Sequence, residues 1–355
     1  MKETSEHEQD KTEHGIVVSS RVRLARNVRN FAFSGWLKKE DRLKLLGILK
    51  ESVAKLSSMQ STFVHESMDH FSPLEKQMLV EQHLISREQA AKNAGSGIVV
   101  SKDKTLSIML NEEDHLRIQS LRSGLQLHQA WQAADAADSQ LEESLDFAFS
   151  PTLGYLTACP TNVGTGMRAS AMLHLPGLVL SDQINQVIKS VNQIGLAVRG
   201  LYGEGTEALG NLFQISNQMT LGETELQILE RLNKVVKQLI SHEQNAREKL
   251  LQEKNRIVAD QIGRAYGVML YAHSISSKEA LNLLSLLRFG IDIGVLPSTM
   301  RHKIDELIIC TQPAHLQEAA KRKLNAEERD AFRADLLREK IKAMGAEPSI
   351  LKLQN

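Results

Sequence analysis

The chain has 355 residues, enough for two domains or for one large domain with an extension. Its 43 Lys and Arg residues balance 43 Asp and Glu residues, so the molecule lacks the net basic charge that general nucleic-acid binding needs. The only two cysteines, Cys159 and Cys310, exclude a disulfide framework and favour a cytoplasmic location.

The first hundred residues predict a mixture of strands and helices. Residues 1–15 are polar, contain no apolar segment typical of a signal peptide, and predict a flexible lead-in. "GIVVSSRVRL" (15–24) alternates as a strand does, and apolar spacing predicts an amphipathic helix over 40–59. Two strands joined by a polar turn are expected over 97–115.

The next hundred residues continue this mixture. Residues 116–148 predict a helix, because Gly and Pro are nearly absent from them. Segment 154–173 is expected to start extended, to pass a loop rich in Pro and Gly, and then to enter a helix. Ser181 is the predicted N-cap of the helix that follows. "LAVRG" and "NLFQISN" are the last predicted strands.

After Leu221 the strand patterns stop, and the remaining sequence predicts helices that start at Ser277 and Ala326. No apolar run approaches the ~20 residues of a membrane span. The predicted fold class is therefore α+β. Residues 16–254 are expected to form a domain with an antiparallel sheet flanked by helices, and residues 255–355 an all-α domain.

Arginines gather at the ends of the predicted elements. Arg21 and Arg23 share one face of the first strand, because the side-chain period of a strand is two. Arg117, Arg168 and Arg199 each follow a strand or a glycine loop. Converging guanidinium groups would suit a triphosphate, whereas the first pair alone could be a charged strand edge. The P-loop and dinucleotide-binding motifs are absent from the sequence, so arginines would have to hold the phosphates of any nucleotide.

Two further arginines, Arg26 and Arg29, stand in the same stretch and could serve only the surface. The histidines of "HESMDH" (65–70) are five residues apart, whereas a metal-binding pair on one helical face needs a spacing of four. No metal site is therefore predicted there.

A second group of residues has the opposite charge. "NEEDH" places Glu112, Glu113 and Asp114 directly after a predicted strand, where their mutual repulsion calls for a metal, an arginine or a cationic substrate. A solvated turn before a helix is the alternative. Cys159 opens "CPTNVGTGMRAS", whose glycines permit close approach to a ligand. This thiol is either activated by nearby cations or a small core residue.

The segment "RDAFRA" (329–334) lies in the last predicted helix. Arg329 and Arg333 are four residues apart and share a face, with Asp330 beside them. The segment is either a solvated charged face or a second site for a small anion.

Five motifs occur in order: "SSRVRLARN", "HLIS", "NEEDHLRIQ", "CPTNVGTGMRAS" and "RGLYGEG". Together, over roughly residues 16–246, they resemble the phosphagen (guanidino) kinases, which transfer the γ-phosphoryl group of ATP to a guanidinium nitrogen. Within that family the chain is most similar to the bacterial protein-arginine kinases. The first motif begins at Ser19, without the large helical domain that precedes it in small-molecule kinases. "RDAFRA" fits the RDxxRA pattern of a phosphoarginine-binding allosteric pocket.

The resemblance implies a phosphagen-kinase-like catalytic domain over 16–254 and a role for each motif. The expected catalytic residues are Glu112, Glu113, Cys159 and Glu204. The expected ATP-binding residues are Ser19, Ser20, Arg21, Val22, Arg23, His83, Arg117, Arg168, Ala169, Ser170, Ala171, Met172, Arg199, Gly200, Leu201, Tyr202, Gly203 and Glu204. The expected allosteric phosphoarginine pocket contains Arg329, Asp330, Arg333 and Ala334.

The resemblance also implies a reaction and partners. ATP and Mg²⁺ are the expected cofactors of a kinase that phosphorylates arginine side chains in proteins, which marks them for Clp-type proteolysis and controls a stress response. The alternatives are a kinase for free arginine or another guanidino compound and a non-catalytic phosphoarginine-binding adaptor. The expected partners are proteins with exposed arginines, an activator protein, Clp protease machinery and further copies of the chain in a homodimer or larger assembly, without nucleic acid or membrane.

Overall fold

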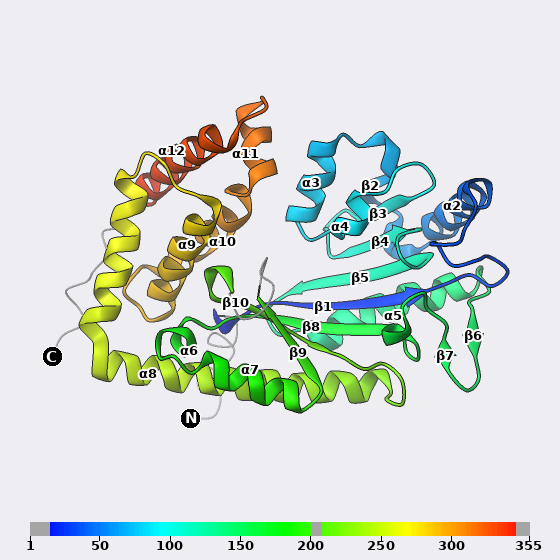
Figure 1. The fold of residues 1–355 in the computed structure, drawn as a ribbon, viewed down its shortest axis with the longest axis horizontal. Coiled ribbons are helices and arrows are strands. Elements are labelled where there is room, and N and C mark those ends of the chain that lie inside the picture. Colours follow the sequence, from blue (N-terminus) through cyan, green and yellow to red (C-terminus); the bar gives the residue numbers. More distant parts are fainter. Residues whose placement is uncertain (1–14, 201–207, 346–355) are drawn as a thin grey trace.

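The computed structural model describes residues 15–200 and 208–345. The described chain forms an eight-stranded antiparallel sheet and, after it in sequence, a group of helices (Figure 1). The predicted lead-in lies almost entirely outside the described residues.

The sheet has the order β2-β3-β4-β5-β1-β8-β10-β9, and every neighbouring pair is antiparallel. The arginine-bearing strand β1 therefore lies inside the sheet, hydrogen-bonded on both sides. The strands are β1 (Val17–Arg26), β2 (Thr62–Ser67), β3 (Gly97–Ser101), β4 (Leu106–Leu110), β5 (Leu116–Ser123), β8 (Met167–His174), β9 (Leu196–Gly200) and β10 (Leu212–Asn217), and the short strands β6 (Phe149–Ser150) and β7 (Gly154–Tyr155) form a separate ribbon.

The helices of the first region cover both faces of the sheet. They are α2 (Lys39–Ala54), α3 (Pro73–Glu81), α4 (Arg87–Ala90), α5 (Leu127–Glu142), α6 (Pro176–Leu180), α7 (Ile184–Gln193) and the first part of α8 (Glu225–Tyr271). In β3, Val99 joins the main core, whereas Ile98 and Val100 join a second cluster that includes Leu79 of α3. This alternation explains why the strand is buried on both faces.

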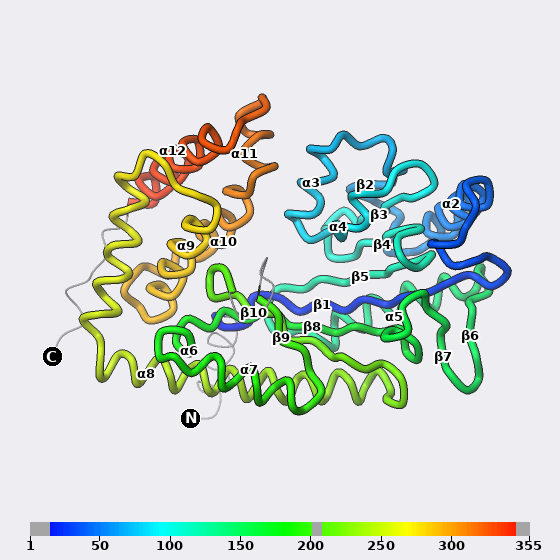
Figure 2. The backbone as a smooth tube through the Cα atoms, in the orientation of Figure 1, coloured from blue at the N-terminus to red at the C-terminus, as the bar shows by residue number. Residues whose placement is uncertain are grey.

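The C-terminal region contains the remaining helices and its own hydrophobic core. They are α9 (Ser277–Asp292), α10 (Arg301–Cys310), α11 (Pro313–Ala320) and α12 (Ala326–Met344). The side chains of Ser276 and Asn325 cap the N-termini of α9 and α12, so these two helices begin at the residues that the sequence predicted. Helix α8 joins the two regions and changes direction between them (Figure 2). It leaves helical geometry at Lys254, with φ −138° and ψ 30°. The division at residues 254 and 255 stays a prediction, because one helix crosses it.

Three expected elements differ from the structure. Residues 116–123 form β5, not a helix, because Leu116 and Ile118 alternate into the core and pair with β4. The end of segment 154–173 is strand β8 rather than a helix, since it fills the place between β1 and β10. Ser181 does not cap α7; its hydroxyl donates to the Gly177 carbonyl of α6.

Candidate active site

Strand β1 separates its side chains onto two faces of the sheet. Val22 is fully buried in the core, and Ser20 accepts a hydrogen bond from the Gln126 backbone on that side. Ser19 and Arg21 instead line a cavity of about 420 Å³ on the opposite face, here called the larger cavity. Since a strand alternates, Arg23 belongs to the same face, and it lines a second cavity of about 120 Å³, the smaller cavity.

Strand β8 extends both cavities in register with β1. Arg168 lies opposite Arg23, and Ser170 lies opposite Arg21. Ala169 and Ala171 alternate with them and are fully buried in the core. The side chains of Ser20, Val22, Ala169 and Ala171 therefore point away from both cavities, and the assignment of these residues to ATP binding stays a prediction.

The guanidinium groups on this face lie close enough to perturb one another. Burial, followed by the charges of Arg168 and Arg117, lowers the pKa of Arg21 to about 10. Burial and the neighbouring arginines lower the pKa of Arg23 well below its ordinary value. Among the described residues, the buried Nε atoms of Arg23 and Arg168 have no hydrogen-bond partner. Buried donors without partners and crowded like charges both favour a bound anion.

The larger cavity continues from the sheet toward the C-terminal helices. The nitrogen Nη2 of Arg21 donates to Oε1 of Gln214 at 2.5 Å, and both residues line the cavity. His83 also lines it with φ +60°, and burial together with the Arg21 charge lowers the pKa of the imidazole to about 4. His83 is therefore neutral at pH 7 and adds no charge to the arginine cluster.

The smaller cavity brings both charge types together. It is lined by Arg23, Glu113, Arg117, Cys159 and Arg168, among others. Partial burial raises the pKa of Glu113, with Asp114 and Glu112 adding to the rise and Arg117 opposing it. The thiol Sγ of Cys159 lies 3.0 Å from the Thr161 hydroxyl. A carboxylate and a thiol thus face the arginines that carry unsatisfied donors.

Glu112 does not line the smaller cavity, although it is adjacent to Glu113 in sequence. Its side chain is fully buried, and its Oε1 contacts Nη1 of Arg117 at 2.7 Å and the Ser86 hydroxyl at 2.5 Å. Arg117 also contacts Oε2 of Glu113 at 3.2 Å. Glu112 therefore orients Arg117 toward the cavity, and Arg117 in turn holds Glu113.

Some residues that position the site were not expected from the sequence. Asn27, at the end of "SSRVRLARN", donates to Oδ1 of Asp114 at 2.7 Å, and the backbone N–H of Ala158 donates to the same oxygen at 2.7 Å. These contacts fix the turn that carries Glu113 against the loop that carries Cys159. A buried carboxylate needs hydrogen-bond donors, so the sequence could have indicated that Asp114 has such partners. It could not have shown that Asn27 and Ala158 supply them.

The two arginines assigned to the surface have different environments. Arg26 is buried, donates from Nε and Nη2 to Oδ2 of Asp138 at 3.0 and 2.6 Å, and stacks 3.5 Å from the Tyr155 ring centroid. The surface assignment is therefore wrong for Arg26, which faces the core side of the sheet. Arg29 is exposed and pairs with Asp146 at 3.3 Å.

The expected ATP-binding residues Arg199 and Gly200 end β9, beside β10. The charge of Arg199 helps to lower the pKa of Arg168, after the larger effect of burial. Met172 lines the larger cavity. The predictions for Leu201, Tyr202, Gly203 and Glu204 fall outside the described residues.

The expected allosteric residues join α12 to neighbouring helices. Arg333 is buried and donates to the backbone carbonyls of Thr311 at 2.9 Å and Ile275 at 2.8 Å, and to Oδ1 of Asp330 at 2.5 Å. Arg329 is partly exposed and donates to the Leu324 carbonyl at 3.2 Å. Ala334 belongs to the C-terminal core. Arg333 thus connects the last helix to the end of α10 and to the start of α9.

Comparison with known families gives the class of protein. Residues 44–246 match the family described as "ATP:guanido phosphotransferase, C-terminal catalytic domain", so the chain is a phosphotransferase of the guanidino-acceptor class. Residues 255–350 match the family described as "Protein-arginine kinase McsB C-terminal domain". The chain belongs to the protein-arginine kinase branch of the guanidino kinases, a conclusion that its curated relatives support.

Two of these relatives are protein-arginine kinases of other bacteria. The protein of Geobacillus sp. (strain WCH70) is 47% identical over 335 residues, which cover 94% of this chain and 92% of the relative. The protein of Halalkalibacterium halodurans is 47% identical over 333 residues, which cover 94% of each.

Solved structures of guanidino kinases have the same fold. A lombricine kinase superposes with a TM-score of 0.57 at 26% identity and covers 65% of this chain and 67% of its own. The duplicated taurocyamine kinase from Schistosoma mansoni with bound transition-state-analogue components superposes with a TM-score of 0.59 at 28% identity, over 76% of this chain and 39% of its own. These matches confirm the predicted fold class. No described helix is long and apolar enough to cross a lipid bilayer.

Proposed function

We propose that this protein transfers the γ-phosphoryl group of ATP to arginine side chains in proteins. The observation that carries the proposal is the smaller cavity, in which Glu113 and Cys159 face Arg23 and Arg168. The arginines suit a phosphoryl group, and the acidic side suits a guanidinium. Both charge types are needed where a phosphate meets an arginine.

The two cavities suggest how ATP is oriented. The larger cavity is the size of a small-molecule site. Arg21 on its wall is two residues before Arg23 on the same face of β1, and Arg23 lines the smaller cavity. We assign the nucleoside to the larger cavity and the terminal phosphate to the smaller one. Mg²⁺ would accompany the phosphates, because magnesium keeps substrate phosphates and water among its ligands. Phosphoryl transfer depends on such charge neutralisation and alignment.

The acceptor must lose a proton as the N–P bond forms. A guanidinium has a pKa of about 13.8, so its full deprotonation at pH 7 would cost about 9 kcal/mol. Glu113 is the proposed base, since a raised pKa brings the carboxylate closer to the pH at which it must accept a proton. Cys159 would orient the guanidinium from the same side of the cavity.

The choice of a protein acceptor rests on the relatives, which are named protein-arginine kinases. The side chain of Glu113 is 45% exposed, and an exposed base is compatible with an arginine on a large substrate. A free-arginine kinase remains the main alternative. We extend the proposal to the consequences implied by the resemblance: cytoplasmic clients marked for Clp-type proteolysis, control of a stress response, an activator protein and a homo-oligomeric enzyme.

The test combines one substitution with a direct product assay. Glu113→Gln should lower turnover by roughly 10²–10⁴-fold, while ATP affinity measured by calorimetry changes little. Glu88→Gln is the matched control, because Glu88 is an exposed acid near Glu113 that lines neither cavity. Mass spectrometry under conditions that preserve N–P bonds should find phosphoarginine on an arginine-rich protein. Phosphorylation of free arginine alone would overturn the protein acceptor, and an equal loss of ATP binding would overturn the role of Glu113.

The regulatory pocket needs a separate test. Arg329→Ala should remove any response of the kinase to added phosphoarginine and keep the basal rate, because Arg329 lines neither cavity. Arg333→Ala should also remove the response, but it deletes a buried cation with three partners. It should therefore also destabilise the protein. An unchanged phosphoarginine response in Arg329→Ala would exclude this residue from the pocket.

A further inference from the structure

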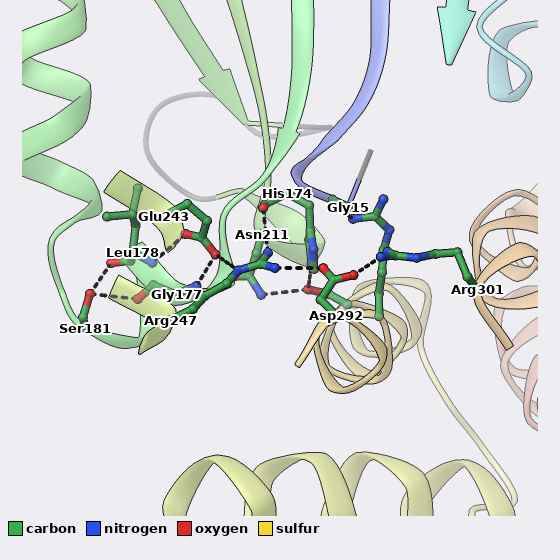
Figure 3. A network of polar contacts seen from close by, with 12 residues as sticks. Gly15, His174, Gly177, Leu178, Ser181, Asn211, Glu243, Arg247, Asp292 and Arg301 are labelled. Carbon is green, nitrogen blue, oxygen red and sulfur yellow. Dashed lines mark hydrogen bonds and ion pairs between the residues drawn. The ribbon is translucent and has the colours of Figure 1, made fainter. Parts of the chain in front are cut away.

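A buried network of charges fixes the C-terminal helices to the sheet region (Figure 3). Arg247 of α8 contacts Glu243 at 2.6 Å and Asp292 of α9 at 3.0 Å. Glu243 accepts hydrogen bonds from the backbone N–H groups of Gly177 and Leu178 at the start of α6, at 2.8 and 2.9 Å. Nη2 of Arg247 also donates to the carbonyl of His174, the last residue of β8, at 3.4 Å. The network therefore sets the position of α9 relative to the end of β8.

A second contact joins the two regions through α3. The buried Glu81, the last residue of α3, accepts a hydrogen bond from the backbone N–H of Ala314 in α11 at 2.9 Å. It also lies 2.7 Å from Nδ1 of His315. The next residues after α3, Gln82 and His83, line the larger cavity. The C-terminal helices are thus attached at two separate places, one of them directly beside the cavity.

Helix α10 forms one wall of the larger cavity. Arg288 of α9 is almost fully buried and donates from Nε to Oδ1 of Asp305 in α10 at 2.8 Å, and from Nη1 to the carbonyl of Gly15 at 2.9 Å. Gly15 stands just before β1, so Arg288 holds Asp305 against the start of the arginine-bearing strand. Asp305, Ile308 and Ile309 all line the cavity.

We propose that the C-terminal region completes the nucleotide site: Ile308 and Ile309 contact the base, and Asp305 accepts hydrogen bonds from the ribose hydroxyls. The inference rests on the proposed kinase function. It assigns the nucleoside end of the site to a part of the chain that lies outside the residues matched by the phosphotransferase catalytic family.

The chemistry of the wall supports this assignment. Met172 and Leu212 of the sheet line the cavity with Ile308 and Ile309, and such an apolar space suits the flat surface of a base. The Asp305 side chain is 41% exposed, and within the described chain only its Oδ1 takes part in a hydrogen bond. A carboxylate has several acceptor positions, so Oδ2 can accept from a hydroxyl donor while Arg288 keeps Oδ1 in place.

The test compares the equilibrium binding of ATP and 2′-deoxyATP by calorimetry in the full chain. The wild type should bind ATP about 10-fold or more tightly than 2′-deoxyATP, as a hydrogen bond to a charged group allows. Asp305→Asn should reduce this ratio toward one, chiefly by weakening ATP. Glu306→Gln is the matched control: the adjacent acid is exposed and does not line the cavity.

A second variant tests the apolar wall without relying on Asp305. Ile309→Asp should weaken both nucleotides to a similar extent and keep their ratio. Wild-type protein that binds both nucleotides equally, or Asp305→Asn that keeps the wild-type ratio, would overturn the ribose contact. Unchanged affinity in Ile309→Asp would overturn the apolar wall. Phosphorylation of a protein substrate is measured in parallel. If the nucleotide-binding results fail while the wild type still phosphorylates the substrate, only the proposed nucleoside contacts are wrong; if the wild type transfers no phosphoryl group, the kinase proposal itself fails.

Discussion

Two groups of arginines occur in this protein, and their partners distinguish them. The first group lies where the C-terminal helices contact the sheet region, a place called the joint below. There Arg247 and Arg288 each contact a carboxylate at 3.0 Å or less, and Arg301 is paired with Asp292. Arg23 and Arg168 line the smaller cavity and contact no carboxylate among the described residues, and each has a buried Nε without a partner. Arg301 also has a buried nitrogen without a partner, but Asp292 holds its charge. Clustered arginines therefore do not define an anion site by themselves. Arginines without carboxylates do, because an incoming anion supplies the missing partner.

The largest expected effect comes from breaking the paired group. Arg247→Ala would leave the buried Glu243 without its cation and would leave Asp292 paired with Arg301 alone. Loss of one partner of a buried ion pair typically costs about 3–5 kcal/mol. Urea unfolding should show this loss. The control is Arg264→Ala, in the same helix, whose contact with Asp260 is exposed and should contribute little. Equal losses in the two variants would contradict the structural role of the joint.

The unpaired group should respond in the opposite way. Arg23→Met removes a cation crowded by Arg21, Arg117 and Arg168, so the free energy of unfolding should stay constant or rise. ATP affinity should fall roughly 10–100-fold, the effect of about 1.5–3 kcal/mol for a hydrogen bond to a charged group. Sulfate should raise the melting temperature of the wild type more than that of Arg23→Met. A variant that unfolds as readily as Arg247→Ala would erase the distinction between the groups.

A smaller effect concerns the carboxylate that faces the unpaired arginines. The pKa of Glu113 is raised, chiefly by partial burial, so the base becomes protonated at a higher pH than an ordinary glutamate. As the pH falls through this raised pKa, kcat/KM should fall, because only the deprotonated form accepts a proton. ADP release measures the profile without exposure of the product to acid. If the residual activity of Glu113→Gln shows the same fall of kcat/KM at low pH as the wild type, the fall comes from a group other than Glu113.

The smallest expected effect comes from Arg29, which belongs to neither group. Its contact with Asp146 joins two exposed side chains, so Arg29→Ala should change the free energy of unfolding by less than about 1 kcal/mol and leave ATP affinity unchanged. The contrasting variant is Arg26→Ala, which breaks a buried contact with Asp138. If Arg29→Ala weakened ATP binding, the anion site would extend beyond the cavity-facing arginines.

Local patterns predicted much of the sheet but not all of its members. The predicted pair of strands over 97–115 is confirmed as β3 and β4, since both are short and apolar with a polar turn between them. Strand β5 was predicted as part of a helix because the absence of Gly and Pro does not distinguish the two states. Its pairing with β1 and β4 decided the outcome, and such long-range pairing is invisible to a local pattern.

For the candidate site, the sequence predicted which side chains of β1 share a face of the sheet. Alternation already separated Arg21 and Arg23 from Val22, and the structure has them on opposite sides. The roles of adjacent acids were not separable in the same way. Glu112 is turned inward by Ser86 and Arg117, which come from other elements, so the difference between Glu112 and Glu113 arises only when the chain folds.

Helix α8 links the two regions by length as well as by contact. It has 47 residues, and an α-helix turns about 100° and advances about 1.5 Å with each residue. One residue added or removed between Glu243 and the helices that follow would therefore rotate the C-terminal region away from the sheet and separate Asp305 from the start of β1. The number of residues in this helix therefore sets the position of the C-terminal region. Recombination between related genes would preserve the larger cavity only where the number of residues in the helix is preserved.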